Sequence, residues 1–226
     1  MISLGVDTST PAGSVALAED DRILGEVNLA AGGHHQERLL RGVDLLLDLA
    51  GIEISRLEVL GVALGPGTFT GLRIGIATVK GLALARGIPA YGLSTLQAMA
   101  LMHRKRDLPV APMIDAGRQE VYAALYGFDR EELRALREER GGPPGEFLES
   151  LPPGPVLFCG DGVLVYRDLV VGIRGSGDRL ETDPCFLGST LARRAAAALR
   201  AKSPWTLAAL KPNYIRPPDA EARPRT

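Results

Sequence analysis

A glycine-rich loop between two predicted elements is the first candidate for chemistry in this sequence. It consists of Gly65, Pro66, Gly67, Thr68, Phe69, Thr70 and Gly71, and it follows an apolar run and precedes a helical pattern. Backbone N–H groups at the start of a helix favour an anion such as phosphate. The loop has neither the Lys-Ser/Thr pair of a P-loop nor the glycine spacing of a dinucleotide-binding loop. By itself it therefore favours a structural turn over an anion site.

A polar turn after the first predicted strand is the second candidate. Asp7, Thr8, Ser9 and Thr10 offer a carboxylate and hydroxyl groups that could hold phosphate or a metal-bound nucleotide. Short turns of this composition usually only reverse the chain, because these side chains hydrogen-bond to their own backbone. On its own, the turn adds little support for nucleotide chemistry.

Histidine, serine and cysteine side chains give no further site. His34 and His35 are neighbours whose side chains diverge, and the only other histidine is His103. No serine lies in a Gly-x-Ser-x-Gly motif. Cys159 and Cys185 lack metal-ligand spacing and are interpreted as buried or incidental thiols. We therefore predict no catalytic residue, no metal site and no cofactor.

The composition is that of a soluble globular protein. The 226 residues are 46% apolar and 23% charged, enough for one large or two small domains. A net charge of −1 disfavours a protein that binds nucleic acid by itself, which would normally carry a basic excess. The N-terminus lacks the basic region of a signal peptide, and no apolar stretch reaches the ~18 residues that span a bilayer. We expect a cytoplasmic protein without a membrane partner.

Hydrophobic patterning predicts an α/β fold with two strand-rich halves. The predicted strands cover residues 2–7, 14–18, 22–29, 57–64, 88–93, 110–115 and 119–128, and the main predicted helices cover 36–50, 71–86 and 189–201. The run at 57–64 is almost continuously apolar, as expected for a strand covered on both faces. We predict a first domain over 1–105 and a smaller second domain over 106–226, with the last helix or the tail able to return to the first.

The helix at 36–50 has an apolar face wider than one sheet can cover. Its apolar residues are Leu39, Leu40, Val43, Leu45, Leu46, Leu47 and Leu49. A helix on a sheet needs a stripe of only ~100°, so the excess must contact a second helix of this chain or a partner protein. Both alternatives remain open from this helix alone. The next helix carries Gly71, Gly75 and Thr78 on one face, where small side chains allow another backbone to approach closely.

Several motifs, in order along nearly the whole chain, resemble those of the bacterial TsaB (YeaZ) family. The run over residues 65–75, which includes Arg73, carries the closest similarity. The segments 5–10, 33–36, 114–122 and 212–216 are also similar to family positions. The resemblance implies a fold of the actin-like ATPase superfamily with two ribonuclease-H-like halves. The implied halves are mixed sheets flanked by helices, and the second half is reduced.

The resemblance also implies a role as a non-catalytic scaffold. TsaB proteins pair with the related transferase TsaD, which transfers a threonylcarbamoyl group to the adenosine next to the tRNA anticodon, and the P-loop ATPase TsaE joins them. TsaD-type enzymes hold a metal through two histidines one helical turn apart, whereas His34 and His35 are adjacent here. The second half is also short for a full nucleotide cleft. Both departures argue against catalysis, and tRNA would be contacted indirectly at most.

A scaffold role would explain the wide apolar face of the helix at 36–50. The expected interface with a TsaD homologue consists of Leu39, Leu40, Val43, Leu46, Leu47, Gly71, Gly75 and Thr78. Without that partner, the same surface should form a homodimer. Gly75 in particular should face the partner helix, so that Gly75→Leu would fold but not bind.

Two other functions remain as alternatives. The first is an enzyme, an actin-fold phosphotransferase or metallohydrolase acting through Asp7, Asp115 and the loop at Gly65. The second is a stand-alone RNA-binding module, which the charge balance disfavours.

Overall fold

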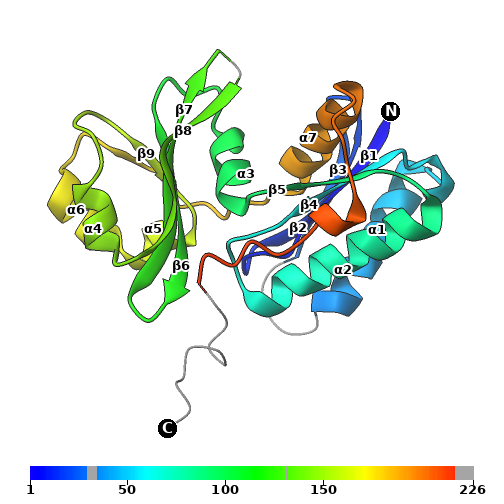
Figure 1. The fold of residues 1–226 in the computed structure, drawn as a ribbon, viewed down its shortest axis with the longest axis horizontal. Coiled ribbons are helices and arrows are strands. Elements are labelled where there is room, and N and C mark those ends of the chain that lie inside the picture. The colour runs from blue at the N-terminus through cyan, green and yellow to red at the C-terminus, as the bar shows by residue number, and fades with distance from the viewer. Residues whose placement is uncertain (30–34, 131, 217–226) are drawn as a thin grey trace, which may run out of the picture. The chain divides into compact units, whose positions relative to one another are not determined.

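The chain folds into two compact units. The computed structural model describes residues 1–29, 35–130 and 132–216 (Figure 1). Unit 1 consists of Met1–Ala98 and Phe186–Asn213, and unit 2 consists of Met99–Cys185 and the chain from Tyr214. The chain passes from unit 1 to unit 2 within the helix that begins at Thr95, after Ala98. Among the described residues, no helix is long and apolar enough to cross a membrane.

The sheet of unit 1 has five strands in the order β3-β2-β1-β4-β5. They are β1 (Ile2–Asp7), β2 (Gly13–Glu19), β3 (Arg22–Leu29), β4 (Val59–Ala63) and β5 (Ala90–Leu93). The first three are antiparallel neighbours, while β4 and β5 run parallel to β1. All residues of β1 and β4 are buried, as expected for central strands covered on both faces.

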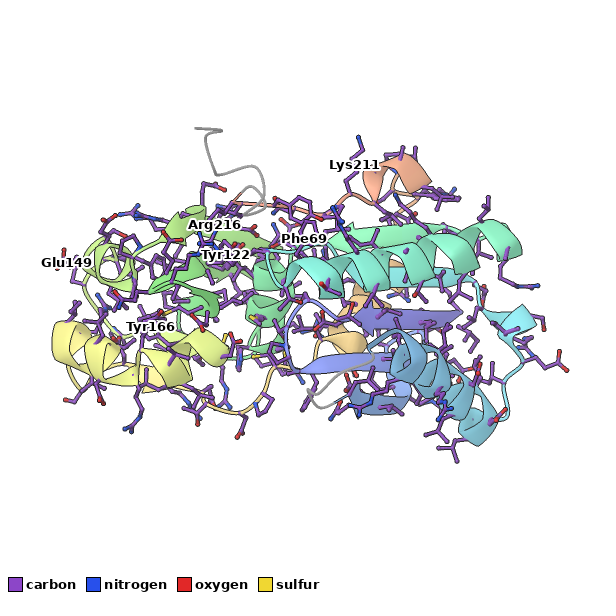
Figure 2. The ribbon with its side chains drawn as sticks, turned by 90° about the horizontal axis from the view of Figure 1, so that it is seen from below. Phe69, Tyr122, Glu149, Tyr166, Lys211 and Arg216 are labelled. Atoms are coloured by element: carbon purple, nitrogen blue, oxygen red, sulfur yellow. The ribbon has the colours of Figure 1, made fainter. Side chains whose placement is uncertain are left out.

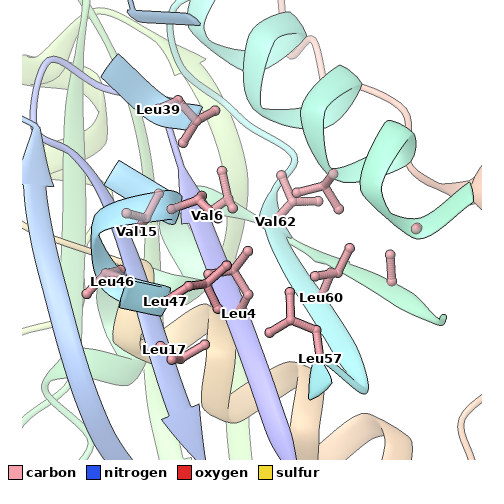
Figure 3. Close-up of a cluster of buried hydrophobic side chains, with 14 of the residues drawn as sticks. Leu4, Val6, Val15, Leu17, Leu39, Leu46, Leu47, Leu57, Leu60 and Val62 are labelled. Atoms are coloured by element: carbon pink, nitrogen blue, oxygen red, sulfur yellow. The ribbon is translucent and has the colours of Figure 1, made fainter. Parts of the chain in front are cut away.

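Helices cover both faces of this sheet. They are α1 (His35–Ala50) and α2 (Phe69–Arg86) on one face and α7 (Gly188–Arg200) on the other. Leu4 and Val6 point to the first face, into a core shared with Leu39 of α1 (Figure 3). Gly5 and Gly61 point to the opposite face, where an added Cβ would overlap the backbone of α7. These glycines let α7 approach the sheet closely, which is why residues 186–213 belong to unit 1.

Short helical segments complete unit 1. A 3-10 turn (Ile54–Arg56) precedes β4, and a second one (Leu207–Ala209) follows α7. The helix α3 (Thr95–Met102) carries the chain from unit 1 into unit 2. Leu210, just after the second 3-10 turn, is buried in the main core of unit 1.

Unit 2 repeats the same strand order, with longer antiparallel strands but shorter parallel strands and helices. Its strands are β6 (Val110–Gly117), β7 (Glu120–Asp129), β8 (Glu132–Gly142), β9 (Leu157–Cys159) and β10 (Arg179–Leu180), in the order β10-β9-β6-β7-β8. Again three antiparallel strands adjoin two parallel ones. The helices are α4 (Pro144–Glu149), α5 (Asp161–Val165) and α6 (Arg167–Arg174). The predicted fold class is confirmed: two ribonuclease-H-like halves with mixed sheets, of which the second is reduced.

Candidate functional site

The two candidate loops of the sequence lie together at one edge of the unit 1 sheet. Because β1 and β4 are parallel neighbours, the turn after Asp7 and the glycine loop after Ala63 leave the sheet side by side. The N–H of Thr68 donates a hydrogen bond of 2.7 Å to the carbonyl oxygen of Ser9. The hydroxyl of Thr8 donates one of 2.7 Å to the carbonyl oxygen of Gly71. The loops therefore bind each other.

The polar side chains of the first turn are buried, and those of Asp7 and Ser9 bond each other. Asp7 and Ser9 are fully buried, and Thr8 and Thr10 nearly so. The Oδ1 atom of Asp7 accepts hydrogen bonds from the N–H of Ser9 at 2.9 Å and from its hydroxyl at 2.6 Å. This is the bonding of an Asx turn. The Oδ1 atom of Asp7 therefore stabilises the turn.

Glycines make the close contact between the loops possible. A Cβ atom on Gly67 would overlap the carbonyl oxygen of Ser9, and one on Gly71 would overlap that of Thr8. A Cβ on Gly75, one turn further along α2, would overlap the hydroxyl oxygen of Thr8. Gly71 and Gly75 therefore pack against this chain's own turn. The expectation that they face a partner protein is corrected on this ground.

The C-terminal motif also contacts the glycine loop. The N–H of Asn213 donates a hydrogen bond of 2.6 Å to the carbonyl oxygen of Leu64. A Cβ on Gly65 would lie 2.8 Å from the carbonyl oxygen of Asn213, so the backbones touch there too. In unit 2, Arg216 (Figure 2) forms an ion pair with Glu120 and donates a hydrogen bond of 3.4 Å to the carbonyl oxygen of Ala116. The segment 212–216, which is similar to family positions, thus contacts the rest of the chain in both units.

Most of the wide apolar face of α1 is buried in the protein's own core. Leu39, Val43, Leu46 and Leu47 are at most 7% exposed and belong to the main core cluster of unit 1 (Figure 3). The expectation that these four side chains form a partner interface is wrong, because the sheet already covers them. Leu40 is 44% exposed, so it points away from that core.

A shallow apolar groove runs between α1 and α2 on the outer side of unit 1. Its volume is about 480 Å³, and its lining residues are Leu40, Arg73, Ile74, Ala77, Thr78, Gly81 and Leu82. Gly81 leaves it open, since a Cβ there would meet no atom within 4 Å. Of the interface residues expected from the sequence, only Leu40 and Thr78 line this groove. We call this surface the α1/α2 groove.

The first turn of α2 carries an aromatic and a basic side chain in contact. The guanidinium carbon of Arg73 lies 3.6 Å from the centre of the Phe69 ring, the geometry of a cation–π pair. Phe69 is 38% exposed, and Figure 2 shows its place at the start of α2. Pro66 is buried, whereas Thr68 and Thr70 are exposed. The glycine loop therefore has a buried structural side and an exposed side beside the groove.

Asp115, the other carboxylate of the enzymatic alternative, lies in unit 2. Its Oδ1 atom accepts hydrogen bonds from the N–H of Gly117 at 3.0 Å and from the hydroxyl of Tyr166 at 3.4 Å. The N–H of Asp115 donates to the carboxylate of Asp161 at 3.1 Å. Burial raises the pKa of Asp161, and it also raises the pKa of Tyr166, to which the charge of Asp115 contributes. No sequence spacing had linked Asp161 or Tyr166 to Asp115.

The histidines that the sequence brought into question are only partly described. His34 lies outside the described residues, and the side chain of His35 is not among those described. Across the part of the chain that is described, no three His, Cys, Asp or Glu side chains are placed to hold a metal ion. His103 lies in unit 2, beside Cys185.

Comparisons with known proteins agree with this architecture. Residues 24–216 match the family model described as TsaD, tRNA N6-adenosine threonylcarbamoyltransferase. The *Bacillus subtilis* protein named tRNA threonylcarbamoyladenosine biosynthesis protein TsaB is 28% identical, over 99% of this chain and 97% of that protein. The solved structure of YeaZ from *Pseudomonas aeruginosa* is 30% identical with a TM-score of 0.79, covering 94% of this chain and 100% of that one.

A more distant structure shares only the fold. The ROK hexokinase of *Thermus thermophilus* is 15% identical with a TM-score of 0.51, covering 89% of this chain and 100% of that one. The family match over most of the chain and the full-length similarity to YeaZ settle the classification. The chain belongs to the TsaB (YeaZ) family of the actin-like ATPase superfamily.

Proposed function

We propose that this protein is a non-catalytic scaffold subunit in the formation of threonylcarbamoyladenosine in tRNA. Its partner in this proposal is a homologue of the TsaD transferase, and a TsaE-type ATPase joins the pair. Family membership supports the pathway, since the *Bacillus subtilis* relative is named for tRNA threonylcarbamoyladenosine biosynthesis. The family model that matches is described as the transferase itself. The protein would contact tRNA only through these partners.

The mutual closure of the two loops is the observation that carries the non-catalytic role. A nucleotide phosphate at the start of α2 would need backbone donors from the glycine loop. The N–H of Thr68 instead bonds the carbonyl oxygen of Ser9, and the hydroxyl of Thr8 bonds that of Gly71. Separating the loops would leave the carbonyl oxygen of Ser9 and the buried hydroxyl of Thr8 without these bonds, which costs free energy. The loops serve as a structural joint.

The α1/α2 groove is the surface that we assign to the TsaD homologue. It is mostly apolar, with Arg73 as its charged member. Leu49 and Leu84, at the far ends of the two helices, are more than 70% exposed, at 77% and 75%. Exposed apolar surface of this kind commonly marks a protein-binding site. Two helices of the partner would complete a four-helix contact, and two copies of this chain would pair through the same surface when the partner is absent.

A matched pair of leucine variants tests the assignment. Leu40→Asp places a charge in the groove, while Leu136→Asp places one on β8 of unit 2; the two leucines are similarly exposed, at 44% and 46%. We expect Leu40→Asp alone to abolish co-purification with a tagged TsaD homologue and to lose complementation of the tRNA modification. Circular dichroism of both variants checks that they fold. Equal binding by the two folded variants would refute the groove as the interface.

An ATP assay tests the enzymatic alternative. An actin-fold phosphotransferase or metallohydrolase would turn over ATP as a pure protein. The scaffold proposal expects turnover at background, with no effect of Asp7→Asn, which keeps the Oδ1 acceptor of the turn. Activity that follows the protein through purification and disappears in Asp7→Asn would favour the enzyme.

A further inference from the structure

A pocket in unit 2 lies apart from the loops and the groove of unit 1. Its volume is about 610 Å³, which is within the range of pockets that bind small molecules. One wall is the segment 104–109, which leads from α3 to β6, and the other consists of residues of β7 and β8 and the turn at Arg130 (Figure 1). All of its lining residues belong to unit 2. We call it the arginine pocket.

Positive charge dominates the lining of the arginine pocket. Among the described residues, its charged members are Arg104, Arg106, Arg130, Arg134, Asp107 and Asp129. Arginines gathered around one cavity repel each other, and an anion placed between them relieves this repulsion. The chain as a whole has a net charge of −1, so the positive excess is a local feature of the pocket. The pocket therefore attracts an anionic ligand.

Ion pairs within the protein occupy two of the four arginines. Arg134 forms an ion pair with Asp129, with 2.9 Å between the charged groups. Arg106 lies 3.6 Å from Glu181, whose carboxylate also pairs with Arg179 at 2.9 Å. Exposed ion pairs of this kind are weak, because water screens both charges. Arg106 and Arg134 therefore still contribute positive potential to the pocket.

The other two arginines have their guanidinium groups available. Within the part of the chain that the structure describes, Arg104 and Arg130 form no ion pair and no side-chain hydrogen bond. Both residues are exposed, and they lie on different walls of the pocket. A guanidinium group presents parallel N–H donors in a planar fork that matches two oxygens of a phosphate. A phosphate inside the pocket would therefore be bound from both sides.

Part of the lining is apolar and half-buried. It includes Leu108 and Pro109, which directly precede β6, and Phe128 near the end of β7. An inorganic ion would leave this surface in contact with water, whereas a ligand with an aromatic or apolar body would bury it. The combination of arginines and apolar side chains therefore favours an organic phosphate over a free inorganic anion.

The shape of the site favours a small ligand over a nucleic acid. A protein that binds a nucleic-acid backbone normally carries a basic excess and an extended basic surface. Here the net charge is −1, and the arginines line one concave pocket. A ligand that enters this pocket is a small molecule on both grounds.

We propose that the arginine pocket binds a small organic phosphate. Arg104 and Arg130 hold the phosphate, and the aromatic or apolar body of the ligand lies against Leu108 and Phe128. This binding function goes beyond the scaffold role. It involves no chemical step and no TsaD homologue, so the two proposals can fail separately.

Calorimetry on the full-length protein tests the proposal with uridine monophosphate, which joins a phosphate to a planar ring. We expect saturable binding of one molecule per chain at low ionic strength, which added salt weakens. Uridine and inorganic phosphate each supply one half of the probe, and both should bind more weakly than the whole. No binding of uridine monophosphate would overturn the proposal. So would equal affinity for the probe and for either half.

Three glutamine variants show whether the pocket binds the phosphate. Arg104→Gln and Arg130→Gln each remove one guanidinium group, and each should weaken binding of uridine monophosphate about tenfold. Arg167→Gln is the matched control, since Arg167 is an exposed arginine at the start of α6 in the same unit, and it should not change the affinity. Circular dichroism checks that all three variants fold. Equal affinity in the three folded variants would place the ligand elsewhere and overturn the proposal.

A short RNA hairpin distinguishes a small ligand from a nucleic acid. We expect the hairpin to bind no more tightly than uridine monophosphate does. Tighter binding of the hairpin that Arg104→Gln and Arg130→Gln weaken would show that the pocket belongs to a nucleic-acid surface. That result would overturn the assignment of a small ligand.

Discussion

The hydroxyl of Thr8 donates a 2.7 Å hydrogen bond to the carbonyl oxygen of Gly71, which joins the first turn of the chain to the first turn of α2. Thr8 is 3% exposed, so water cannot easily replace this bond. Thr8→Val keeps the shape of the side chain and removes the donor. We expect a loss of about 1 kcal/mol in the free energy of unfolding. Urea titration measures it, and Thr78→Val in the α1/α2 groove is the matched control, with little expected change.

Two glycines of α2 should respond oppositely to the same substitution. Gly75→Ala places a Cβ against the Thr8 hydroxyl, so we expect destabilisation of about 1–3 kcal/mol. Gly81→Ala adds a Cβ that meets nothing within 4 Å, and the better helix former should stabilise the protein by about 0.5–1 kcal/mol. Thermal melting of the two variants compares them. Equal melting temperatures would show that Gly75 does not pack against Thr8.

Replacing a leucine by aspartate should have different effects on the two sides of α1. The side chain of Leu46 is 4% exposed and lies in the core of unit 1. Leu46→Asp would bury a charge there, so we expect this variant to unfold. Leu40→Asp leaves the core intact, so we expect this variant to be a folded monomer in sedimentation velocity, whereas we expect the wild type alone to be a dimer. A folded, dimeric Leu40→Asp would show that the copies pair through another surface.

The elements of unit 1 were predictable because local patterns encode them. The alternation of Ile2, Leu4 and Val6 predicted β1, and the helix expected over residues 36–50 is α1 (His35–Ala50). β8 (Glu132–Gly142) was not predicted. It is an edge strand rich in exposed charged residues, so it carries no apolar alternation. Strands of this type gain their order from the neighbouring strand rather than from their own composition.

The candidate sites were harder to predict because they depend on distances between elements. The sequence showed the width of the apolar face on α1. It did not show which part of that face the sheet covers. The small face of α2 was visible too, yet Gly75 meets Thr8 and not a partner. Sequence spacing describes one element at a time, whereas these contacts join several.

The last prediction concerns the pH at which the thiol of Cys185 ionises. An ordinary thiol has a pKa of about 8.5 and is largely protonated at neutral pH. The bonds from Cys159 and His103 lower the pKa of Cys185 to about 6, so its thiolate should form as the pH rises through that value and be complete near neutrality. The ultraviolet absorbance of thiolate, taken as wild type minus Cys185→Ser, measures this titration.

His103→Ala supplies the control for the cause of this shift. His103 contributes to the lowered pKa of Cys185, so the midpoint of the titration should move to higher pH in this variant. His35→Ala, on α1 of unit 1, changes a histidine in the other unit and should leave the midpoint unchanged. A wild-type midpoint near that of an ordinary thiol would contradict the prediction. So would an unchanged midpoint in His103→Ala, because His103 would then have no effect on the thiolate.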